Sequence, residues 1–167
     1  MNILSAPTDP AILIQANELP DIENIEELKE QISKLPALAR FNDEQIEIIY
    51  SIAHSLYIQG KLDNAFGIFQ ILIVYRPFDA RYMSAYAICC KRMGKFDMAI
   101  PAFAAALAMN SKDLTAAVHM AECLAAIGKK KESAEIIVPL IKLAYLDEGL
   151  TSLRKRAETL KELLDNS

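Results

Sequence analysis

The sequence predicts an all-α fold: tandem helix pairs in a right-handed solenoid, with an N-terminal helical extension and a C-terminal capping helix. Gly60, Gly94 and Gly128 recur at a constant interval of 34 residues (60 to 94, 94 to 128), the length of a common two-helix repeat unit. Helix-favouring residues such as Ala, Leu, Ile, Lys and Glu dominate the composition. The chain lacks the Asn-Gly and Asp-Gly pairs that are typical of β-hairpins. We therefore expect repeated helices and no strands.

This period is typical of tetratricopeptide repeats (TPRs), and we expect three of them. Residues 1–42 are expected to form an N-terminal extension. It would contain an amphipathic helix over 21–34 and a partly flexible stretch over 1–20, which carries three prolines. Residues 43–167 are expected to form the TPR domain, with repeats over about 46–79, 80–113 and 114–147 and a capping helix over 148–165.

Each unit is expected to follow one plan. Its first helix ends at the glycine, which adopts a left-handed conformation at little cost, and its second helix follows at once. In the first unit these helices are expected over 43–59 and 61–75, where Arg76 and Pro77 stop the second one. Pro139 is expected to kink the second helix of the third unit. Asp147 is expected to cap the final helix.

Equivalent positions of the units carry residues that we expect to set the helix spacing. Small side chains would let the two helices cross closely, and a larger side chain opposite them would fill the gap. None of the glycines belongs to a GxGxxG or P-loop pattern, so no phosphate site is expected. The predicted structural positions are Gly60, Ala65, Phe69, Gly94, Ala99, Phe103 and Gly128.

Composition excludes several function classes. The formal net charge of −4, from 18 basic and 22 acidic residues, disfavours nucleic-acid binding, which requires a basic face. No apolar run approaches the roughly 20 residues that span a bilayer, so membrane insertion is not expected. The three cysteines, Cys89, Cys90 and Cys123, lack metal-ligand spacing. We interpret them as free, buried thiols of a cytoplasmic protein. No cofactor or metal is expected.

The two histidines do not suggest catalysis, because neither has a partner acid or nucleophile at a recognisable spacing. His54 shares a helix face with Tyr50 and Tyr57 and is expected to line a groove. His119 is expected to be packed and hydrogen-bonded. With Glu122, three residues later, it could form at most half of a metal site. We therefore expect a protein that is not an enzyme.

The first helix of each unit is expected to line the concave surface of the solenoid. Such a groove would take an extended peptide whose apolar side chains enter pockets between helices. The alternative for Tyr50 and Tyr57 is packing against the N-terminal helix. Glu47, Thr115 and Ala125 occupy further inward-facing positions. The predicted peptide-binding residues are Tyr50, His54, Tyr57, Arg81, Ser84, Ile88, Lys91, Val118 and Glu122.

Several segments resemble the class II chaperones of bacterial type III secretion, the LcrH/SycD/IpgC family. The likeness covers about residues 35–144 in the same order and spacing. The segments around 78–82 and 119–124 are the more specific, because they are not general TPR features. The resembling segments are 50–53, 57–65, 69–72, 78–82, 93–100 and 119–124.

The resemblance implies three TPRs behind a helical extension, and a chaperone of the bacterial cytoplasm that holds hydrophobic translocator proteins before export. It implies a concave groove that takes an extended translocator segment, with apolar residues and a proline as anchors. The family's groove tyrosines correspond to Tyr50 and Tyr57, and a third aromatic position is occupied here by His54. It also implies a homodimer when the chaperone is free of cargo, with the N-terminal extension over 1–42 as the candidate dimerisation element. A needle-subunit chaperone, which would take an amphipathic helix, or a general scaffold remains the alternative.

Overall fold

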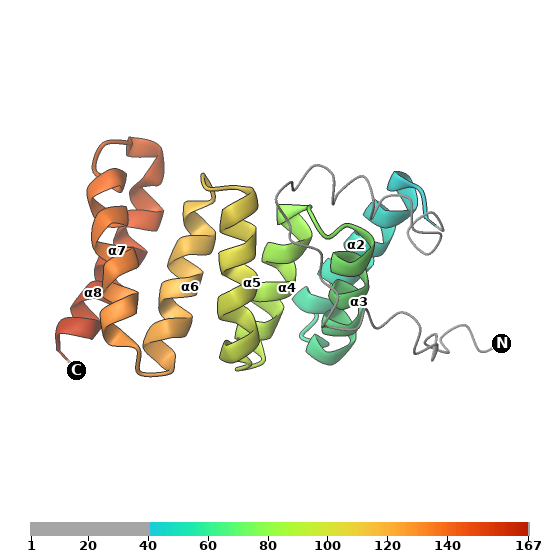
Figure 1. The fold of residues 1–167 in the computed structure, drawn as a ribbon, viewed down its shortest axis with the longest axis horizontal. Coiled ribbons are helices and arrows are strands. Elements are labelled where there is room, and N and C mark those ends of the chain that lie inside the picture. The colour runs from blue at the N-terminus through green and yellow to red at the C-terminus, as the bar shows by residue number, and fades with distance from the viewer. Residues whose placement is uncertain (1–40, 167) are drawn as a thin grey trace, which may run out of the picture. The chain divides into compact units, whose positions relative to one another are not determined.

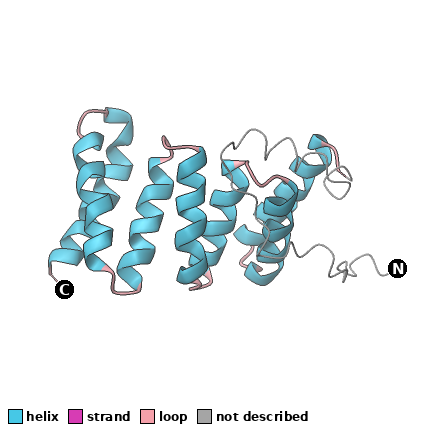
Figure 2. Ribbon diagram, viewed as in Figure 1, coloured by secondary structure: helices cyan, strands magenta, loops and turns pink. Residues whose placement is uncertain are grey.

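The computed structural model describes residues 41–166, and every structural statement below concerns this part of the chain. Here the chain forms seven α-helices and one short 3-10 helix, η3, and no strand (Figure 2). The helices stack side by side in chain order (Figure 1). The elements are α2 (Asp43–Ile58), α3 (Leu62–Tyr75), α4 (Ala80–Arg92), α5 (Phe96–Met109), α6 (Leu114–Ala126), α7 (Lys130–Ala144), η3 (Glu148–Leu150) and α8 (Thr151–Asp165).

The all-α prediction is confirmed, and the ends of α2 and α3 lie within one residue of those expected. Three successive helix pairs, α2/α3, α4/α5 and α6/α7, are followed by α8. α7 continues through Pro139 to Ala144, so the proline does not end the helix. The expected amphipathic helix over 21–34 lies outside the described residues. The boundary between residues 42 and 43 stays a prediction.

The capping helix begins differently from the prediction. Asp147 was expected to cap one continuous helix, but the chain first makes the 3-10 turn η3. The Asp147 carboxylate accepts the backbone N–H of Gly149 at 2.8 Å. Its backbone carbonyl accepts the N–H of Leu150 at 3.0 Å, and this three-residue spacing closes a tighter turn than an α-helix does. α8 therefore starts at Thr151.

The three repeat glycines are the residues that end the first helices. Gly60, Gly94 and Gly128 have φ angles of 76°, 73° and 81°, and no other described residue has a positive φ. After each glycine, the next N–H bonds a carbonyl five residues back, as from Lys61 to Leu56 at 2.9 Å. This arrangement satisfies carbonyl groups that the helix end leaves free.

Two glycine substitutions should therefore act in opposite directions. In Gly94→Ala the new Cβ would meet nothing within 4 Å, so its cost is conformational: we expect a loss of about 1–2 kcal/mol in the free energy of unfolding. Gly67, inside α3, has a helical backbone and the same free space. Gly67→Ala should raise that free energy by about 0.5–1 kcal/mol. Urea unfolding measures both, and shifts in the same direction would contradict the proposed role of the positive φ.

The buried residues of the core occupy equivalent positions in the repeat units. Ala65, Ala99, Phe69 and Phe103 are at most 1% exposed, as predicted for the residues that set the helix spacing. In the third unit Ser133 replaces the alanine and is also buried; its hydroxyl donates to the backbone carbonyl of Ala121 at 2.8 Å. The substitution thus leaves no unsatisfied hydroxyl in the core.

All three cysteines are free and buried, as predicted. Burial raises the pKa of Cys89 and that of Cys123 to about 11, so both thiols stay protonated at neutral pH. None of the described helices is long and apolar enough to cross a bilayer.

Candidate peptide-binding site

α2 and α4 form most of the wall of one cavity of about 230 Å³, here called the first cavity. The repeat explains why they meet: both are first helices of their units and present equivalent positions to the same side. Six of the nine predicted site residues come together here. The lining residues are Tyr50, His54, Tyr57, Phe69, Arg81, Ser84, Ala85 and Ile88.

The base of the first cavity is aromatic and is anchored in the core. The Tyr50 ring lies 6.2 Å from the ring of the buried Phe69 and 5.3 Å from that of Tyr82. The ring of His54, an exposed side chain, lies 6.2 Å from Tyr50 on the same helix. An apolar side chain entering this cavity would therefore meet ring faces already held in place, which limits the ordering cost of binding.

Tyr57, at the other end of the cavity, is held by α4. The guanidinium carbon of Arg92 lies 4.8 Å from the centre of the Tyr57 ring. The same guanidinium donates to the backbone carbonyl of Tyr57 at 3.1 Å. Arg92 does not line the cavity, so these two interactions leave it open.

The rim of the first cavity carries a network of charges. Arg81 donates to Glu47 and to Asp79, each at 2.8 Å, and the Tyr82 hydroxyl donates to Glu47 at 2.7 Å. The hydrogen bonds from Arg81 and Tyr82 hold the pKa of Glu47 below its ordinary value. Of these charged groups only Arg81 lines the cavity, and the two carboxylates hold its guanidinium in place.

Lys91 and Glu122 lie outside the first cavity, in a second polar cluster formed by Lys91, His119, Glu122 and Arg156. Lys91 and Arg156 both donate to His119 Nδ1, at 2.9 and 2.8 Å. Arg156 also donates to both Glu122 oxygens at 2.6 Å, and Lys91 pairs with Glu122 as well. The His119 ring stacks on Phe103 at 5.6 Å. The prediction of a packed, hydrogen-bonded His119 is confirmed.

The environment of Glu122 fixes its charge. Burial raises its pKa, but hydrogen bonds from Arg156 and Lys91 outweigh that effect and hold the pKa well below its ordinary range. Glu122 is thus a carboxylate at all physiological pH values. Its partners are ammonium and guanidinium groups, so Glu122 belongs to an ion-pair cluster.

Val118 does not line an open groove, contrary to the prediction. Its side chain is 0% exposed and belongs to a core cluster that includes Ala157 and Leu160 of α8. The reason is that α8 packs against this part of α6 and covers it. Sequence reasoning missed Arg156 for the same reason: nothing local indicates that it reaches across to Glu122 from α8.

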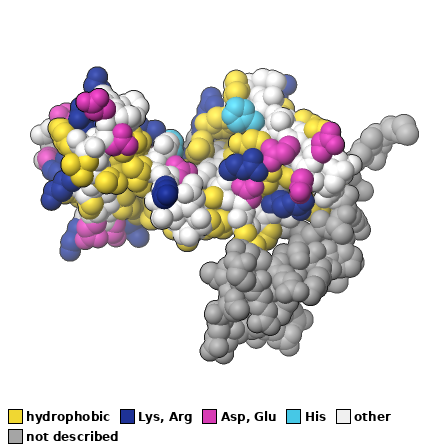
Figure 3. All heavy atoms as spheres, turned by 90° about the horizontal axis from the view of Figure 1, so that it is seen from above, with side chains coloured by type: hydrophobic (Ala, Val, Ile, Leu, Met, Phe, Trp, Pro, Cys, Tyr) yellow, Lys and Arg dark blue, Asp and Glu magenta, His cyan; other side chains and the backbone are white. Residues whose placement is uncertain are grey.

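Figure 3 shows one face of the molecule, on which hydrophobic side chains lie between charged groups of both signs. No large single-sign surface is visible on that face. The mixture agrees with the mild net charge of the chain.

Comparison with known proteins identifies the family. No family model matches the sequence. The low calcium response locus protein H of Yersinia pseudotuberculosis is 31% identical over 133 residues, which are 75% of this chain and 79% of that protein. Its counterpart from Yersinia pestis is 27% identical over 133 residues. The chain belongs to the family of the low calcium response locus protein H.

Solved structures of the family share the fold. SycD, the type III secretion translocator chaperone of Yersinia enterocolitica, matches with a TM-score of 0.70 at 26% identity, over 77% of this chain and 88% of SycD. A chain of a type III secretion complex from Aeromonas hydrophila matches with a TM-score of 0.75 at 26% identity, over 85% of this chain and 95% of that one. The predicted resemblance to translocator chaperones and the predicted fold class are confirmed.

Proposed function

We propose that this protein holds an extended segment of a hydrophobic type III secretion translocator in the first cavity. The observation that carries the proposal is the convergence of Tyr50, His54 and Tyr57 with Arg81, Ser84 and Ile88 on one cavity, in a chain of this family. SycD has been solved with a peptide of the translocator YopD, which supports a peptide as the ligand. PcrH, a protein of the same fold, has been solved with the chaperone-binding regions of PopD and PopB.

The geometry suits this role. Aromatic rings at the base would receive apolar side chains of the cargo, and the charged rim would meet its backbone. Translocators have to enter membranes, so their apolar segments would aggregate or insert too early in the producing cell. Preventing this requires binding and no chemistry, and release requires only moderate affinity. An extended segment that orders on binding provides such affinity.

We infer the remaining properties from the same role. The protein acts in the bacterial cytoplasm and is not an enzyme. A dimer in the absence of cargo is supported by SycD, which has been solved in an alternative dimer. The helix expected over 21–34 is the candidate element for that dimer, and it lies outside the described residues.

Binding to a translocator tests the proposal directly. The full-length protein is titrated into a fluorescently labelled N-terminal segment of the translocator encoded nearest to its gene, and anisotropy is measured. We expect saturable one-to-one binding. A labelled needle-subunit helix serves as the competing ligand and should not bind. Binding of that helix in place of the translocator segment would favour a needle-subunit chaperone and contradict the proposal.

A further inference from the structure

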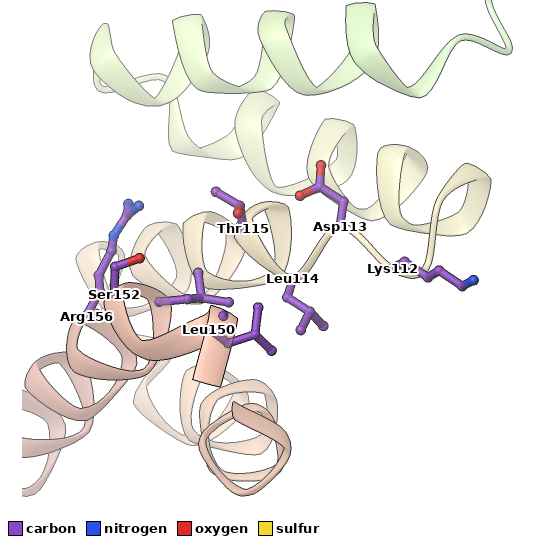
Figure 4. A pocket seen from close by; sticks show the side chains of 9 residues that line it. Lys112, Asp113, Leu114, Thr115, Leu150, Ser152 and Arg156 are labelled. Carbon is purple, nitrogen blue, oxygen red and sulfur yellow. The ribbon is translucent and has the colours of Figure 1, made fainter. Parts of the chain in front are cut away.

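A second cavity of about 480 Å³ lies between the start of α6 and the start of α8. Figure 4 shows the side chains that line it, which come from the α5–α6 connection, α6, η3 and α8. None of the nine predicted site residues lines it. Its lining residues are Lys112, Asp113, Leu114, Thr115, Gly149, Leu150, Ser152, Leu153 and Arg156.

The two cavities adjoin each other. Ser84 lines the first cavity, and its hydroxyl donates to the carboxylate of Asp113, which lines the second, at 3.4 Å. Ile88 lines the first cavity, and Lys91, one helical turn further along α4, belongs to the same cluster as Arg156, which lines the second. The Ser84–Asp113 contact and the Lys91–His119–Glu122–Arg156 cluster therefore connect the two cavities across α4 and α6.

The second cavity offers apolar surface for a side chain of a bound peptide and hydroxyl groups for the backbone of that peptide. Leu114, Leu150 and Leu153 supply apolar surface, and the first two lie close together in Figure 4. Thr115 and Ser152 are exposed, and their hydroxyls make no side-chain hydrogen bond within residues 41–166. These hydroxyls remain available to a peptide backbone.

The polar groups deeper in the cavity are already engaged. Asp113 accepts the backbone N–H of Ala116 at 3.1 Å and so caps α6, and Arg156 is held by Glu122. A ligand group that pairs with Asp113 or Arg156 would compete with these contacts. An apolar side chain would displace none.

We propose that the second cavity receives a second apolar anchor of the same translocator segment; this inference rests on the proposed function. Because the two cavities adjoin, the separation of the two anchors along the peptide follows from the spacing of the helices. Packed helices lie about 8–10 Å apart, so the two steps from α2 to α6 span about 16–20 Å. An extended chain advances about 3.3 Å per residue. The two anchors are therefore separated by about five or six residues.

The test compares a short and a long cargo peptide on the full-length protein. The short peptide carries only the anchor of the first cavity. Two long peptides each add a leucine about six residues away, one on each side. We expect one long peptide to bind about 10-fold tighter than the short one, because a second apolar side chain leaves water at a partial ordering cost.

Two variants test whether the tighter binding of the long peptide comes from the second cavity. Ser152→Trp, at an exposed position of α8, places a ring in the second cavity and should abolish the 10-fold gain while leaving the short peptide unaffected. Thr159→Trp, exposed on the same helix but not lining the cavity, should retain it. Equal binding of short and long peptides, or a gain that survives Ser152→Trp, overturns the second anchor and leaves the proposed function intact. Failure of every peptide to bind overturns both.

Discussion

Replacing both groove tyrosines, in Tyr50→Ala/Tyr57→Ala, should weaken binding of the translocator segment by about 100-fold. Both rings line the first cavity, and truncation of a central aromatic residue commonly costs about 2 kcal/mol or more of binding free energy. The two losses are not fully additive, and about 2.8 kcal/mol for the pair corresponds to the 100-fold change. Fluorescence anisotropy with the labelled segment measures it.

Folding has to be separated from binding in this experiment, because Tyr50 also packs on Phe69 of the core. Thermal unfolding of the double variant tests its integrity. Ser84→Trp provides a second route, since it adds a ring to the cavity and removes none. Tyr145→Ala is the matched control: it deletes an exposed aromatic side chain that does not line the cavity, and it should bind normally. A folded double variant with full affinity would refute the groove as the binding site.

Glu122→Gln should lower the free energy of unfolding at pH 7 by about 2–3 kcal/mol. The amide cannot neutralise Lys91 and Arg156, which would then face each other and His119 in a partly buried site. Urea unfolding measures the loss. Asp165→Asn is the matched control, because it breaks the more exposed ion pair with Lys161 and should change stability little. Equal stability of wild type and Glu122→Gln would show that the cluster does not hold α8 in place.

Glu122 also makes the free energy of unfolding depend on pH in the acid range. The pKa of Glu122 is lower in the folded chain than its ordinary value of 4.5. The stabilisation is therefore fully present above pH 4.5 and is lost as the pH falls below it, because protonation is then more favourable in the unfolded chain. Wild type should lose stability between pH 5 and pH 3 more steeply than Glu122→Gln does.

The sequence by itself determined the fold and predicted six of the eight residues that line the first cavity. The glycine period placed Gly60, Gly94 and Gly128 at the helix ends, and small or large side chains at equivalent positions identified the core. These features are local or strictly periodic, so one chain is enough to read them. The residues that line the first cavity followed from the same periodicity, because α2 and α4 present equivalent positions to one side.

Only the tertiary structure decided how the C-terminal end is built. A capping helix was predictable, but the face of α6 that it covers depends on how Ala157 and Leu160 pack with Val118. That packing buries Val118, brings Arg156 to Glu122 and leaves the second cavity beside η3. Helical periodicity gives the direction of a side chain around its own axis. It does not give the rotation and position of one helix against another, which the long-range fit of their side chains sets.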